Sequence, residues 1–297
     1  MHVRTKRFLP LLGVSCLAFG LLAPVNAAQN SAEIEVFTTG SGTKKALRYA
    51  PEAGSKAGFS METKMSMTQQ MNGMQMPAQD MPSMITDYAL TVDEIRESGE
   101  IVTSVETVDA RLGEGGNPMV RGSVEQAIRA GVGGKTRAIQ KPTGEVVSSE
   151  RLGGDGVAMP GGVDQMSIRF PEEAMGVGGR WVERRNMEQG GVRFSQHTTY
   201  EVKAIEGNVV TLGMEVKVEA PRQGMENPQL PPGSMELVKM NGNGTGTIKM
   251  DLAKMIAIES KMEMSTDQEV KITMNGGEQT MSQTMSMEMT MKERDLD

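Results

Sequence analysis

Long stretches of the chain alternate apolar and polar residues, and this alternation predicts β-strands. In residues 209–219 (VVTLGMEVKVE), every second residue from 210 to 218 is apolar, and most of the residues between them are polar. Residues 61–71 (METKMSMTQQM) and 281–293 (MSQTMSMEMTMKE) alternate similarly, with methionine in the apolar positions. Successive side chains of a strand point to opposite faces, whereas a helix needs spacings of three and four. We therefore expect strands with one apolar and one solvent-facing side.

Turn residues separate these strands and indicate hairpins. Ser98-Gly99 and Glu206-Gly207-Asn208 are two examples. Two short helices are also expected, at residues 123–130 and 234–240, each with a serine at the N-cap position. The predicted fold is mainly β: two related halves of curved antiparallel sheet, half-barrel or sandwich-like, with one short helix each.

The two halves are predicted from an internal repeat. LRYAPEAGSKAGFSMETK (47–64) aligns with IRFPEEAMGVGGRWVERR (168–185), and TDYALTVDEI (86–95) aligns with QHTTYEVKAI (196–205). The spacing between aligned segments is nearly constant, which favours a duplication. We divide the chain accordingly into an N-terminal linker (28–43), a first β repeat (44–160) and a second β repeat (161–297).

Residues 1–27 have the pattern of a signal peptide. The stretch begins with basic residues, continues with an apolar centre and ends on the small residues Val25-Asn26-Ala27. An uncleaved membrane anchor is the alternative interpretation. We expect cleavage after Ala27 and export to the periplasm or the extracellular medium, with no later segment apolar for long enough to span a bilayer.

Charge and cysteine content exclude several functional classes. The leader contains three of the 31 basic residues, so the mature chain has 28 basic and 38 acidic side chains and a net charge of −10. This balance argues against nucleic acid and anionic lipid headgroups as electrostatic partners. The single cysteine, Cys16, lies in the leader. The mature chain therefore has no disulfide, no thiolate metal site and no cysteine nucleophile.

The motifs that could indicate catalysis are weak. AGVGGKT (130–136) lacks the first glycine of a phosphate-binding loop, because Arg129 occupies that position, and it fits a glycine helix stop better. His197 is the one histidine of the mature chain and shares its strand face with Arg193 and Glu201, which predicts a solvated side chain. The scattered carboxylates, such as Asp87 and Glu172, are interpreted as a charged solvent face. We predict neither an enzyme nor a cofactor.

Methionine is unusually abundant, with 28 in 297 residues. Three interpretations stay open: adaptable packing of the core, a methionine-lined cavity for an acyl chain, and thioether binding of Cu(I) or Ag(I). Under the packing interpretation, we expect the buried face of the last strand to consist of Met285, Met287, Met289 and Met291. The metal interpretation rests on the apparent loop MNGMQMPAQDMPSM (71–84). Its candidate ligands are Met71, Met74, Met76, Met81 and Met84.

One segment resembles a known group of proteins. Pro171, Gly178 and Trp181, followed by the strands up to Lys217, resemble an uncharacterised family of exported bacterial proteins with a domain of unknown function. The resemblance extends loosely over most of residues 44–292. It implies a curved antiparallel sheet, similar in outline to the half-barrels of periplasmic lipoprotein carriers. It implies no catalytic or binding residues.

The expected function is therefore non-enzymatic. We expect an exported soluble protein that binds an apolar ligand, such as a lipid or an acyl chain, on a sheet lined by methionine and valine. A methionine-based Cu(I) or Ag(I) binding protein is the first alternative, and an envelope structural or assembly protein is the second.

Overall fold

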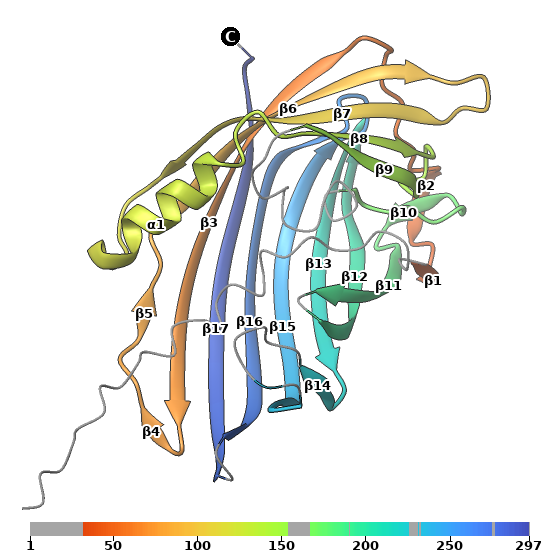
Figure 1. Ribbon diagram of the computed structural model, residues 1–297. Coiled ribbons are helices and arrows are strands. Elements are labelled where there is room, and N and C mark those ends of the chain that lie inside the picture. The colour runs from red at the N-terminus through yellow and green to blue at the C-terminus, as the bar shows by residue number, and fades with distance from the viewer. Residues whose placement is uncertain are drawn as a thin grey trace, which may run out of the picture.

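The computed structural model describes residues 32–153, 167–189, 191–225, 231, 233–274 and 277–296 (Figure 1). Among these residues there is one α-helix, α1 (Pro118–Arg129). The strands are β1 (Glu33–Thr38), β2 (Ser41–Lys45), β3 (Lys56–Met71), β4 (Met74–Gln75), β5 (Gln79–Asp80), β6 (Met84–Ile95), β7 (Ile101–Leu112), β8 (Lys135–Gln140), β9 (Val146–Gly153), β10 (Met175–Val177), β11 (Arg180–Gln189), β12 (Val192–Glu206), β13 (Val209–Ala220), β14 (Gln223–Met225), β15 (Met235–Asp251), β16 (Ile256–Met274) and β17 (Gly277–Arg294).

Fifteen of these strands form one antiparallel sheet. Its main path runs β1-β11-β12-β13-β15-β16-β17-β3-β6-β7-β8-β9, while β4 and β5 pair with β3, and β14 pairs with β15. β2 and β10 form a separate two-stranded sheet. The C-terminal strand β17 lies between β16 and β3. It therefore joins the meander of the second half to the meander of the first.

The sheet is open and strongly curved. Figure 1 shows the long strands β3, β17, β16, β15 and β13 side by side, with β6 to β9 crossing over one end of them. The strand pairs follow the hairpin order expected from the turn residues, and Gly99 and Gly207 adopt positive φ in two of these turns. The prediction of a mainly β, curved antiparallel fold is confirmed.

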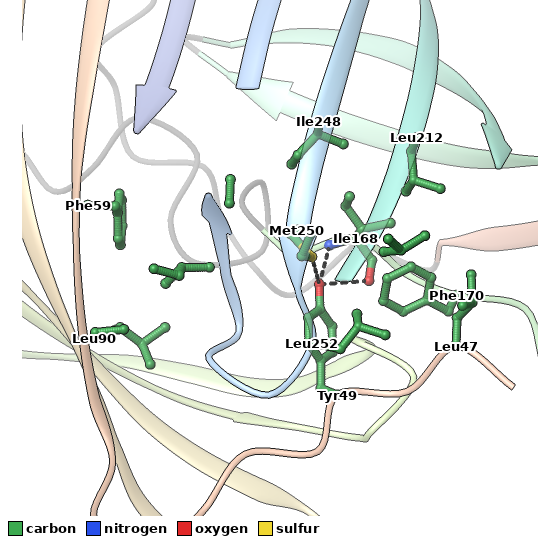
Figure 2. Close-up of a cluster of buried hydrophobic side chains, with 14 of the residues drawn as sticks. Leu47, Tyr49, Phe59, Leu90, Ile168, Phe170, Leu212, Ile248, Met250 and Leu252 are labelled. Atoms are coloured by element: carbon green, nitrogen blue, oxygen red, sulfur yellow. Dashed lines mark hydrogen bonds between the residues drawn. The ribbon is translucent and has the colours of Figure 1, made fainter. Parts of the chain in front are cut away.

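The main core lies where this curvature brings together strands from distant parts of the sheet order. Phe59 of β3 belongs to the same buried cluster as Leu212 of β13 (Figure 2). The Tyr49 hydroxyl donates a hydrogen bond to the carbonyl oxygen of Ile168 (3.3 Å) and accepts one from its N–H (3.1 Å). All three tyrosines and the single tryptophan of the sequence belong to this cluster. The few aromatic residues are thus concentrated in the core, while most methionines lie elsewhere.

A second, smaller cluster lies at the other end of the long strands. It contains Leu237 of β15, Val270 of β16 and Met281 of β17, all at most 5% exposed. Between the two clusters the strands keep their period of two. In β13, for example, Val210, Leu212, Val216 and Val218 are buried, as the alternation predicts. The two clusters therefore share one face of the sheet, which is interrupted on β3, β17 and β16 by a row of glutamines, Gln69, Gln283 and Gln268.

The helix predicted at residues 234–240 is wrong, because these residues form the start of β15. Met235 and Leu237 pair with Ile272 and Val270 of β16, and the register then shifts between Leu237 and Lys239. This shift leaves Val238 as an extra residue in the strand, as in a β-bulge. The bulge interrupts the alternation, so the segment has the irregular apolar spacing of a short helix.

The helix predicted at residues 123–130 exists but begins earlier, at Pro118. Proline suits the first helical position because a backbone N–H there has no hydrogen-bond acceptor within the helix. Ser123 is therefore not the N-cap. It lies inside the helix, where its hydroxyl donates to the carbonyl oxygen of Val120 at 2.8 Å. The helix ends before the glycines of residues 131–134, and β8 and β9 follow as a hairpin, which confirms that AGVGGKT is a helix stop.

The predicted division of the chain can be compared with the structure only where its residues are described. The signal peptide (1–27) and the boundary between residues 160 and 161 lie outside them. Residues 33–38, placed in the N-terminal linker, form β1 and pair with β11, so this stretch is a paired strand. The duplication stays a prediction. No helix within the described ranges is both long enough and apolar enough to cross a membrane.

Candidate functional site

The candidate site is a group of methionines on β3, β16 and β17, which we call the methionine band. Because directly paired residues of antiparallel strands project to the same face, the strand register places all of its members on one side of the sheet. The methionine band consists of Met61, Met65, Met67, Met262, Met264, Met285, Met287, Met289 and Met291.

The band is built from direct cross-strand pairs. Met287 of β17 is opposite both Met264 of β16 and Met65 of β3, which makes a row of three methionines across three neighbouring strands. The further pairs are Met289 with Met262, Met285 with Met67, and Met291 with Met61. Met61 and Met291 pack against the main core, and Met281 belongs to the second cluster. The band therefore adjoins the main core and extends toward the second cluster, from which the row of Gln69, Gln283 and Gln268 separates it on the same face.

The band is less buried than the cores on either side of it. Met67 is 9% exposed, and the other eight methionines of the band are partly exposed. By contrast, Leu212 of the main core and Leu237 of the second cluster are fully buried. Met285, Met287, Met289 and Met291 thus lie on the expected face of the last strand but are only partly buried. This face presents thioether and methylene groups to solvent.

Beside the band, β15 carries three glycines on the same face. Gly242, Gly244 and Gly246 are opposite Thr266, Met264 and Met262 of β16. A Cβ on Gly246 would lie 2.6 Å from the carbonyl oxygen of Lys261 and 3.1 Å from the methyl carbon of Met214. A Cβ on Gly244 would lie 2.9 Å from the carbonyl oxygen of Glu263, and one on Gly242 would lie 2.8 Å from the hydroxyl oxygen of Thr266. The band therefore ends against a strip of bare backbone.

The five methionines predicted as metal ligands follow the length of β3. Met71 lies opposite Met74 at the hairpin end, and the Met76 N–H donates to the Gln69 carbonyl oxygen (2.8 Å). Further along, the Met81 N–H donates to the Met65 carbonyl oxygen (3.0 Å), and Met84 pairs with Thr63. The eight residue steps from Thr63 to Met71 span roughly 26 Å at about 3.3 Å per residue. Of the five, the structure brings Met71 and Met74 face to face, with Met76 in the next row.

The opposite face of the same strands is polar and contains a groove of about 950 Å³. Its side chains alternate with those of the band, and among them are Glu62, Lys64, Glu263 and Glu288. Lys64 lies 3.6 Å from Glu62, and Lys261, on the same face of β16, lies 2.7 Å from Glu263 and 3.8 Å from Glu288. Much of the acidic charge is thus balanced by neighbouring lysines on a solvated surface. This arrangement agrees with the charged solvent face predicted for the carboxylates.

Two carboxylates depart from that prediction. Asp87, 5% exposed, accepts from Arg111 (2.7 Å) and Arg294 (2.6 Å). Glu183, 2% exposed, lies on the core face of β11 and accepts from the Arg185 Nε (2.8 Å). Burial raises the pKa of Glu183 by more than the charge of Arg185 lowers it. The sequence contained a signal for Glu183, because it lies two residues after Trp181 and therefore on the same face.

The other side chains that could take part in catalysis or bind a metal ion do not form a site among the described residues. His197 is exposed on β12, on the polar face, as predicted. Within the described part of the chain, no group of three or more histidine, cysteine, aspartate or glutamate side chains could hold a metal ion. Hard metal ions prefer oxygen or imidazole donors. The concentrated donor atoms of this protein are the thioether sulfurs of the band.

Comparison with known protein families identifies a match over part of the chain. A search of curated proteins finds no match to the chain. Residues 155–254 match a family of unknown function, DUF6263. This segment contains Pro171, Gly178 and Trp181, which carry the resemblance seen in the sequence, and it ends just after β15. Over this segment the chain is similar to DUF6263 proteins.

Proposed function

We propose that the protein is an exported, non-enzymatic protein that binds an apolar ligand, a lipid or an acyl chain, on the methionine band. The leader-like residues 1–27 support export to the periplasm or the extracellular medium. The observation that carries the binding proposal is an apolar patch of nine methionines, eight of them partly exposed, that adjoins the buried main core. A row of glutamines on the same face, Gln69, Gln283 and Gln268, separates this patch from the second cluster. Contiguous exposed apolar surface is typical of a binding site.

The energetics favour a ligand of flexible shape. Each methylene group that leaves water contributes about 0.8 kcal/mol, so roughly ten methylenes supply about 8 kcal/mol before the cost of association. Methionine side chains have three rotatable bonds and a polarizable sulfur, and they adapt to different apolar partners. The band therefore suits acyl chains of varied length better than one rigid molecule.

The shape of the sheet supports the same class of function. Figure 1 shows that β3, β17 and β16 are long neighbouring strands of an open, curved sheet, and most of the methionines on one face of these strands are partly exposed. The similarity in outline to the half-barrels of periplasmic lipoprotein carriers, drawn from the sequence, supports a carrier for apolar chains. The glycines of β15 add to this argument, because an extended chain can lie close to backbone that bears no side chains.

The test is binding of a fluorescent fatty acid to the delipidated mature protein. Met287→Glu places a charge at the centre of the band and is expected to weaken binding at least about tenfold, since a charge in an apolar contact is costly. The matched control is Ser286→Glu, one residue away on the polar face. We expect the control to bind like the unmodified protein. Equal affinity of both variants, each with an unchanged circular dichroism spectrum, would overturn the proposal.

A further inference from the structure

Beyond the apolar ligand, we propose that Met65, Met264 and Met287 form a binding site for a soft monovalent cation, Cu(I) or Ag(I). These three residues make the one row of the band in which three neighbouring strands each supply a methionine. They lie on regular, continuously paired strands. This site is distinct from the set predicted in residues 71–84, which extends along β3.

The strand geometry lets the three sulfurs reach one ion. Directly opposite residues of antiparallel strands have Cβ atoms about 4.5–5.5 Å apart. Each methionine sulfur lies two bonds beyond its Cβ, and the side chain rotates freely between staggered states. Met65 and Met264 can therefore lean toward the central Met287 from either side. The three sulfurs then surround a point above β17.

The three thioether sulfurs determine which metal ion this site prefers. Neutral thioethers are soft ligands that favour Cu(I) over zinc, magnesium or calcium ions. The side chains next to this row on the same face are mostly further methionines, with Thr63 on β3 and Thr266 on β16. A monovalent ion is also the least costly to hold there, because neutral ligands leave its charge uncompensated in a partly desolvated site. Partial exposure of the three methionines gives the ion a path from solvent.

Packing alone does not explain the choice of methionine. Strands favour β-branched and aromatic residues, and β3 and β16 carry such residues in the two cores. Phe59 on β3 and Val270 and Ile272 on β16 are examples. Within the band methionine takes most of the apolar positions of β3 and β16, and on β17 it takes every apolar position of this face, Met281 of the second cluster included. Leucine or isoleucine would fill the same space, so the sulfur atom itself distinguishes this stretch.

The experiment replaces the three thioethers without removing their apolar volume. In the variant Met65→Leu/Met264→Leu/Met287→Leu, Cu(I) affinity is measured by competition with a chromophoric Cu(I) chelator under reducing conditions. Ag(I) binding by native mass spectrometry serves as a second readout. We expect affinity to fall more than about 100-fold, since even the outer partners of metal ligands are worth roughly 10–100-fold. The control is Met71→Leu/Met74→Leu/Met76→Leu at the hairpin end, which we expect to leave affinity unchanged.

The outcomes separate this inference from the proposed function. Binding of the fluorescent fatty acid should persist in the band variant, because leucine keeps the surface apolar, while metal binding is lost. Unchanged metal affinity of the band variant, loss of affinity in the hairpin control, or absence of metal binding by the unmodified protein would each overturn the metal site. Failure of fatty acid binding in the unmodified protein would overturn the proposed function and leave the metal result standing by itself.

Discussion

At the residue scale, Glu183 is a carboxylate enclosed by the core face. Its side chain is 2% exposed and lies opposite Thr198, with Arg185 as its charged partner. Burial raises the pKa of Glu183 above its ordinary value, and Arg185 offsets only part of this effect. The folded protein therefore holds a proton on Glu183 at pH values at which the unfolded chain has released it.

We expect Glu183 to make stability depend on pH in a defined direction. Because its folded pKa is raised, its contribution to stability is complete below the unfolded pKa of about 4.3 and is lost as the pH rises through the folded value. The free energy of unfolding, measured with urea from pH 4 to 8, should therefore fall with rising pH in the unmodified protein relative to Glu183→Gln. If the unfolding free energy of the unmodified protein minus that of Glu183→Gln stays constant or increases from pH 4 to 8, the raised pKa of Glu183 is contradicted.

Asp87 is expected to give stability the opposite pH dependence. Burial alone would raise its pKa, but Ser60, Arg111 and Arg294 outweigh this effect and hold the pKa below its ordinary value. Its contribution to stability is present above the unfolded pKa of about 3.9 and is lost as the pH falls through the folded value. The unmodified protein should gain stability relative to Asp87→Asn as the pH rises from about 3 to 5. Slopes of the same sign for both variants would show that general charge effects dominate.

At the element scale, β13 was predicted correctly from the alternation of apolar and polar residues, whereas the start of β15 was not. A period of two fixes which residues share a face, so β13 and the methionine stretches were predicted correctly. The start of β15 was predicted as a helix because Ser234 resembles an N-cap, and the bulge at Val238 interrupts the period of two that would have indicated a strand. Whether a short apolar run forms a strand depends on a partner strand, here β16, that local sequence does not identify.

The glycines of β15 lead to a test of how closely β15 and β16 pack. Gly246→Ala would place a Cβ 2.6 Å from the Lys261 carbonyl oxygen, so backbone must shift, and we expect a loss of about 1–3 kcal/mol in the free energy of unfolding. Gly224→Ala in β14 is the control, because its Cβ would meet nothing within 4 Å. The control should change stability by no more than about 0.5 kcal/mol. Equal unfolding free energies of the two variants would refute the close approach.

At the scale of the whole molecule, strand order is the property that the sequence predicted least. The alternation and the turns predicted hairpins between consecutive strands, and most neighbours in the sheet are consecutive. Two pairings join strands far apart in the sequence, β1 with β11 and β17 with β3, and the second joins residues more than 200 positions apart. This pairing creates the row of Met65, Met264 and Met287. Because a period of two identifies the face of a strand but not its neighbour, the sequence pointed to the methionines of residues 71–84 instead.

The central position of β17 predicts that the fold depends on the last strand of the chain. β17 pairs with β16 on one side and with β3 on the other, so its removal would leave two long unpaired edges and split the apolar face. A mature chain ending at Met274 should therefore lose cooperative thermal unfolding. Removing residues before Gly40 deletes β1, which pairs only with β11 along the main path. That control should unfold cooperatively at a lower temperature.

A synthetic peptide of residues 277–297 completes this test. If β17 acts as the strand that joins both meanders, the peptide should bind the truncated chain by strand addition and restore a cooperative transition, whereas a peptide of scrambled sequence should not. Restoration should also depend on the alternating face, because a peptide with Met285, Met287 and Met289 replaced by serine buries less apolar surface. Cooperative unfolding of the truncated chain alone, at an unchanged midpoint, would show that each meander is stable without the strand between them.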